Sequence, residues 1–188
     1  SVMFLQKWNL PHRNATCAAC FPAGTLAYET LLLLRAFGGR VYSNVPLDSA
    51  ELLPDSATSQ EHTIVDLGED EFTVGRLHPM MDNDLRLRRF QQEASDVETA
   101  VILLDVVLGD GAHPNPAAEI GPAILTAKTA ARSAGRHLEV VALVLGCEND
   151  PQETTAQIEQ LHQAGAHVVT RTEAAANYVG YIITTLNP

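Results

Sequence analysis

The 188-residue sequence predicts a single α/β domain in which five parallel strands alternate with helices. The expected strands are continuous apolar runs, which is typical of parallel strands that are buried on both faces. A segment with helical periodicity follows each run, and turn residues such as glycine separate the two. Repeated units of this kind form a doubly wound, flavodoxin-like sheet, for which we expect the strand order 2-1-3-4-5.

The first half of the chain contains two of the expected strands, at residues 17–21 and 62–67. Residues 26–37 are apolar almost all round and end at Gly38-Gly39, which favours a buried helix. Residues 41–61 are polar and contain two prolines, so we expect an irregular excursion with at most an edge strand there. Residues 68–83 form a long loop, and residues 84–94 a short helix.

The second half repeats the pattern more clearly. Residues 100–107 and 138–145 are apolar strands, and the helix between them starts at Pro116 and stops at Gly135. Asp150, Pro151 and Glu153 form a pattern that favours a helix with Asp150 as its N-cap and Pro151 as its first residue, running to Ala164. Residues 166–170 are the last expected strand, and Thr172 begins the final helix.

The sequence divides into a short leading segment and the domain. Residues 1–15 show no periodicity, and the chain does not begin with methionine, so we expect 1–15 to be a linker or the remnant of a longer chain. Residues 16–188 would then form the flavodoxin-like domain.

Composition and charge exclude several classes of protein. No apolar run approaches the ~20 residues that span a bilayer, and a net charge of −11 argues against a nucleic-acid partner. Lys7 and Lys128 are the only lysines, and neither lies in a glycine-rich phosphate loop. Cys17, Cys20 and Cys147 make no even disulfide framework, which favours a reducing, cytoplasmic setting. We expect no metal site from the Cys17–Cys20 spacing.

In a doubly wound sheet, ligands bind beyond the carboxyl ends of the strands. Five loops lie there: 22–25, 68–83, 108–116, 146–150 and 171–173. Glycines at helix N-termini and one mobile arginine suit an anion. The expected phosphate- or substrate-binding residues are therefore Gly24, Thr25, Arg76, Gly109, Gly111, Gly146 and Asn149.

One histidine is the candidate for proton transfer. His113 lies between a glycine loop and Pro114, which stiffens its backbone, so it suits a general acid or base. An ordinary solvent-exposed loop histidine remains open as an alternative. The acidic residues 69–71 could hold Mg²⁺, but a charge run of this kind is more often a solvated face.

Three phrases of the sequence resemble the C-terminal part of FdrA-type proteins, which are relatives of the succinyl-CoA synthetase subunits. They are CFPAGTLAYETL, HTIVDLGEDEFTVGRLHPMMD and AVILLDVVLGDGAHPNPA, and the resemblance covers about residues 17–180. It implies a CoA-ligase-type, flavodoxin-like domain. The GHAGA loop that carries the phosphorylated histidine of the synthetase α-subunit has no counterpart here, since His113 lies in GAHPNP.

The resemblance implies an acyl-CoA synthetase-like protein that handles an acyl or carbamoyl group with phosphate, of the oxamate carbamoyltransferase type. We expect no cofactor in this chain, with CoA or a phosphorylated acyl donor in the full assembly. Expected partners are other domains or subunits of an FdrA-type assembly and a small-molecule substrate, and a homo-oligomer stays open. The competing interpretation is a non-catalytic, flavodoxin-like interaction module of a multi-subunit complex.

Overall fold

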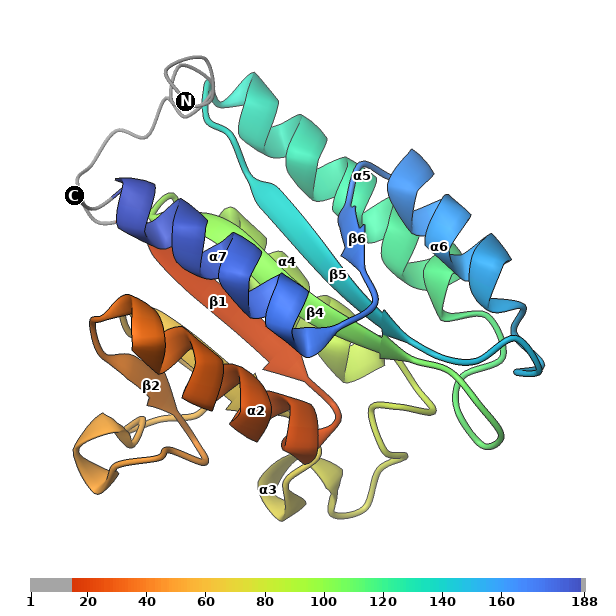
Figure 1. Cartoon of the computed structure of the whole chain (residues 1–188), viewed down its shortest axis with the longest axis horizontal. Coiled ribbons are helices and arrows are strands. Elements are labelled where there is room, and N and C mark those ends of the chain that lie inside the picture. The colour runs from red at the N-terminus through yellow and green to blue at the C-terminus, as the bar shows by residue number, and fades with distance from the viewer. Residues whose placement is uncertain (1–14, 187–188) are drawn as a thin grey trace.

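The computed structural model describes residues 15–186, and they form one six-stranded parallel sheet with the order β2-β3-β1-β4-β5-β6 (Figure 1). The expected leading segment 1–15 lies outside the described residues except for Ala15. The strands are β1 (Thr16–Phe21), β2 (Val41–Ser43), β3 (His62–Asp66), β4 (Thr99–Val107), β5 (Glu139–Leu145) and β6 (His167–Val169).

The predicted α/β class and the order of the five expected strands are confirmed, but the number of strands is wrong by one. β2 lies in the proline-containing excursion and adds a parallel edge strand beside β3, with Tyr42 opposite Thr63. Its three residues are too few to give a periodic pattern. Tyr42 and Leu53 pack with Val65 of β3, and the Leu53 N–H donates to the Ser43 carbonyl of β2.

Helices cover both faces of the sheet, as the continuous apolar strands predict (Figure 1). On one face lie α2 (Gly24–Leu34) and α7 (Thr172–Leu186), which pack against each other. On the other lie α4 (Asp84–Ser95), α5 (Pro116–Ser133) and α6 (Thr154–Gln163). The short helix α3 (Asp70–Thr73) interrupts the expected loop 68–83.

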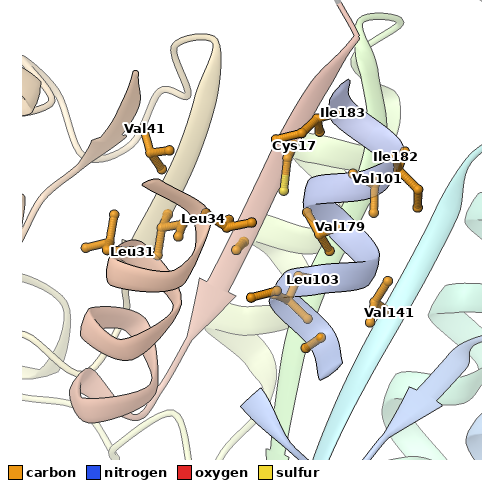
Figure 2. Packing of buried hydrophobic residues seen from close by; sticks show 14 of the residues in the cluster. Cys17, Leu31, Leu34, Val41, Val101, Leu103, Val141, Val179, Ile182 and Ile183 are labelled. Atoms are coloured by element: carbon orange, nitrogen blue, oxygen red, sulfur yellow. The ribbon is translucent and has the colours of Figure 1, made fainter. Parts of the chain in front are cut away.

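The side chains of β4 alternate between two separate cores. Val101 and Leu103 pack under α2 and α7, whereas Ile102 and Leu104 pack under α4 and α5. Figure 2 shows the first of these cores, in which residues of α2 and α7 pack against residues of the sheet: Leu31 and Leu34 of α2, Val179 and Ile182 of α7, Leu103 of β4 and Val141 of β5.

Helix α6 begins three residues later than predicted. Glu153 adopts a left-handed conformation with φ of +56°, which a helical residue cannot have, so the helix starts at Thr154. The Asp150 carboxylate accepts a hydrogen bond from the backbone N–H of Cys147 instead of capping a helix. Asp150 therefore closes the loop after β5.

Gly180 is where α7 contacts the 3₁₀ turn that follows α2, and we expect Gly180→Ala to destabilise the fold. A Cβ there would lie 2.4 Å from the ring of Phe37. Overpacking of this kind costs about 1–3 kcal/mol, and the gain of alanine over glycine in a helix offsets at most ~1 kcal/mol of it. Urea denaturation measures the loss.

Gly121→Ala on α5 is the matched control for this substitution. Its Cβ would meet the Ala164 Cβ at 3.6 Å, an ordinary contact, so we expect no loss of stability. Shortening Phe37 to alanine in the Gly180→Ala protein should recover part of the loss. Equal stability of the two alanine variants would contradict the packing role of Gly180.

Candidate functional site

The carboxyl ends of all six strands meet at one edge of the sheet, here called the rim (Figure 1). Two aspartates lie at the rim on the strands that flank β1. Asp66 is paired with Phe21, and Asp105 lies one residue beyond the Cys20–Leu104 pair. Strand alternation places both aspartates on the face that α2 and α7 cover, because Ile64 and Leu103 pack there.

Asp105 is fully buried and is paired with Arg86 of α4, which is also buried. The guanidinium Nη2 donates to the Asp105 carbonyl and lies 3.4 Å from its Oδ1. Among residues 15–186, Asp105 Oδ2 has no hydrogen-bond partner. Burial raises the pKa of Asp105 to about 7, against the attraction of Arg86, which lowers it.

A chain of side chains leads from this buried pair to His113. Arg86 Nη1 donates to Asn83 Oδ1 over 3.1 Å, and Asn83 Nδ2 donates to Glu119 Oε2 over 3.0 Å. The other carboxylate oxygen of Glu119 lies 3.3 Å from His113 Nε2. The His113 side chain is 17% exposed, so only a small part of it reaches solvent, and its contacts lead back into the protein.

The loop that carries His113 is held by a buried glutamine from the β5–α6 connection. Gln152 Oε1 accepts from the Gly109 N–H, and its Nε2 donates to the carbonyls of Gly109 and His113. Gly109 has a φ of +125°, which side-chain-bearing residues rarely adopt. The glycine loop therefore owes its shape to a residue 43 positions away in the sequence.

Gly24 opens α2, two residues before the predicted start at residue 26, and lies beside a carboxylate. A Cβ on Gly24 would lie 2.5 Å from Asp66 Oδ2, so a side chain there would displace Asp66. Burial raises the pKa of Asp66, which is nearly covered. A Cβ on Gly68 would likewise lie 2.6 Å from the Pro22 carbonyl oxygen and 3.1 Å from His78 Nε2. The first and second rim loops thus touch through two glycines.

The loop after β5 has its own closure. Cys147 donates to Asp150 from its backbone N–H and from Sγ, and Thr154 donates to the Cys147 carbonyl. An open hollow of about 640 Å³ adjoins it, and its walls include Glu148, Glu153 and Glu159. These glutamates make that hollow unfavourable for an anion.

The structure brings only part of the predicted anion site together. Gly109 lies near Asp150 and hence near Gly146, and His113 donates its N–H to the Met80 carbonyl of the second loop. Gly24 lies with Asp66 and Gly68. The other predicted residues are exposed: Thr25 in the first turn of α2, and Arg76, Gly111 and Asn149 in their loops. Binding of an anion by this set stays a prediction.

The prediction from sequence missed the residues that support the site. They are Asn83, Arg86, Glu119, Gln152 and the two rim aspartates Asp66 and Asp105. One signal for the aspartates is present in the sequence, since each interrupts or ends an apolar run at the carboxyl end of a strand. The remaining partners come from distant segments.

Across residues 15–186, no group of three His, Cys, Asp or Glu residues is arranged to hold a metal ion. Cys17 and Cys20 are buried on opposite faces of β1, and burial raises the pKa of both thiols. This geometry gives no support to a redox pair. Nor does any helix in this range have the length and apolar character needed to cross a membrane.

Two comparisons with known proteins place the chain among relatives. The family model described as CoA-ligase matches residues 20–182. The chain is also 41% identical over 145 residues to "Uncharacterized protein YahF" of Escherichia coli (strain K12), a match that covers 77% of this chain and 28% of that protein. The chain therefore spans little more than a quarter of the length of this relative.

Proposed function

Because the chain belongs to the CoA-ligase family, we propose that it is the CoA-ligase-type component of an FdrA-like enzyme. This enzyme transfers an acyl or carbamoyl group between phosphate and an acceptor, as in an oxamate carbamoyltransferase. Since the chain matches 28% of a longer relative, other domains or subunits supply the nucleotide and CoA sites. The assembly works in the cytoplasm, consistent with three cysteines that form no disulfide framework.

The observation that carries this proposal is the support of His113 at the rim. Its side chain reaches solvent over a small part of its surface, its backbone is fixed by Met80 and Gln152, and its Nε2 lies 3.3 Å from Glu119 Oε1. In transfer from an acyl phosphate, the carbon–oxygen bond to phosphate breaks and the acceptor bonds the acyl carbon. His113 donates its Nε2 proton to the departing phosphate and receives the proton that the acceptor loses.

The start of α2 supports a phosphate subsite at the same edge. The N-cap residue Ala23 carries no capping group, and no acidic residue lies in the first turn. The helix dipole and the first N–H groups of such a terminus favour an anion. Asp66 lies against Gly24, so a bound phosphate is more favourable when Asp66 carries a proton, and burial raises the pKa of Asp66.

A non-catalytic interaction module is the second candidate, and the second rim loop favours it. Val74 is 79% exposed and Leu77 62% exposed, and Met81 of the same loop is also exposed. Exposed apolar side chains that follow one another closely in one loop favour a surface that a partner covers. The Gly109 N–H is already bonded to Gln152, which removes one donor from the proposed anion site.

The test is an assay of the complex copurified from the native host, with carbamoyl phosphate and oxamate as substrates. We expect His113→Ala to lower kcat by roughly 10²–10⁴-fold, the range for loss of a general acid or base. The His113 side chain is only 17% exposed, so the melting temperature of the variant is measured as well, and we expect the loss of kcat to exceed any loss of stability. The isolated chain should neither hydrolyse ATP nor form acyl-CoA.

His162→Ala is the control, because this histidine is exposed on α6. It should leave kcat unchanged. A copurified complex that turns over normally with His113→Ala would assign the proton transfer to a partner and favour the interaction module. An ATP-dependent CoA-ligase activity of the isolated chain would contradict the need for further domains.

A further inference from the structure

We propose that Asn83 and Glu119 are positioning residues that fix the ring of His113, and that the buried Arg86–Asp105 pair anchors them to the core. The chain of contacts runs from Asp105 through Arg86, Asn83 and Glu119 to His113 Nε2. This proposal rests on the proposed function, because it names the residues that position the histidine assigned to proton transfer there. Its test, however, needs no substrate and no partner.

The contacts of the ring define which nitrogen carries the proton. The backbone N–H of Asn115 donates to His113 Nδ1 over 3.1 Å, and a backbone N–H can only donate. Nδ1 must therefore present its lone pair, so in the neutral ring the proton is on Nε2. Nε2 faces Glu119 Oε1, which is an acceptor, so both contacts specify the same tautomer.

Asn83 determines where Glu119 lies. Its amide is 1% exposed and uses both ends, accepting from Arg86 and donating to Glu119. Rotating the amide by half a turn would place its NH₂ group against the Arg86 guanidinium and its oxygen against the Glu119 carboxylate. Both contacts would be repulsive, so Arg86 fixes the orientation of the amide and thereby the donor that Glu119 meets.

The buried pair gives this chain a rigid end. Arg86 is anchored by the carbonyl and the carboxylate of Asp105, on the central strand β4. Glu119, by contrast, is half-exposed on α5 and has room to move. Without Asn83, its carboxylate would be free to turn to solvent, and the His113 ring would keep only the contact with Asn115.

The experiment follows the His113 ring in the whole chain. Imidazole ¹⁵N shifts, assigned with His113→Gln, report the tautomer, and mass spectrometry reports the rate at which diethyl pyrocarbonate modifies His113. We expect the Nε2–H tautomer in the protein without substitutions. Asn83→Asp keeps an acceptor for Arg86 but places a carboxylate against Glu119. This variant and Glu119→Ala should speed modification roughly tenfold and mix the tautomers.

Asp110→Asn is the matched control, because it removes one negative charge from the His113 loop without touching the chain of contacts. We expect diethyl pyrocarbonate to modify His113 in this variant at a rate within about twofold of the rate in the protein without substitutions, because an exposed charge has a weak effect. Glu119 is half-exposed, so Glu119→Ala keeps the test decisive if Asn83→Asp fails to fold.

Three results would overturn the inference: an Nδ1–H tautomer in the unmodified protein, an unchanged modification rate in Glu119→Ala, or an unchanged rate in folded Asn83→Asp. The outcome does not depend on catalysis. An intact chain of contacts around a His113 that proves dispensable for turnover would refute the proposed function and leave this inference standing.

Discussion

Replacing Arg86 by methionine is expected to lower the free energy of unfolding at pH 8 by about 3–5 kcal/mol, the usual cost of removing one partner of a buried ion pair. Methionine fills the space of the arginine stem but carries no donor. The Asp105 carboxylate would remain in the core without its cation, and Asn83 Oδ1 would lose its donor. Guanidinium denaturation monitored by circular dichroism gives the loss.

Arg88 of the same helix provides the control. It pairs with Asp84 on the surface, and both side chains are more than half exposed. We expect Arg88→Met to cost less than ~1 kcal/mol. Combining Arg86→Met with Asp105→Leu should recover much of the Arg86 loss, because the buried carboxylate goes with its partner. Equal losses for Arg86→Met and Arg88→Met would show that the buried pair does not stabilise the fold.

The positions of the main strands could be predicted because local sequence determines them. The run from Ala100 to Leu104 is apolar at every position. Such a run is typical of a strand that is covered on both faces, and β4 is buried on both faces. β2 could not be predicted in this way. Its three residues pair with β3 only because the chain returns to that edge, so its strand character depends on tertiary contacts.

The site could be predicted only in its loops. A glycine at residue 109 before a proline-flanked histidine is visible in sequence, and the structure gives it the expected unusual φ. The partners that shape this loop are not visible. Gln152 reaches Gly109 from 43 residues away, and Arg86 reaches Asp105 from 19 residues away. Such pairs depend on strand register and helix orientation, which single-sequence patterns do not specify.

Asp105→Asn is expected to flatten the pH dependence of stability between pH 5 and pH 8. The pKa of Asp105 is about 7 in the folded protein, compared with the ordinary value of 3.8 that applies after unfolding. Between these values the folded protein binds more protons than the unfolded chain, so stability falls as pH rises. This contribution is fully present below the unfolded pKa and is lost as pH rises through the folded one.

The size of the effect follows from the same linkage. From pH 5 to pH 8 the unmodified protein should lose roughly 2–3 kcal/mol more than Asp105→Asn, which cannot titrate. At pH 5 the two proteins should have similar stability, since an amide has nearly the shape of a protonated carboxyl group. Other titrating groups, such as His62, whose pKa burial lowers, are common to both proteins and cancel in the difference.

Denaturation midpoints at pH 5, 6.5 and 8 measure this difference, with Asp110→Asn as the control, because Asp110 is exposed at the rim. Asp110→Asn should follow the unmodified protein at every pH. Parallel curves for Asp105→Asn and the unmodified protein would mean that Asp105 stays ionised in the fold throughout this range. The attraction of Arg86 would then offset the whole cost of burying the Asp105 carboxylate. The loss of stability expected for Arg86→Met would in that case persist at pH 5.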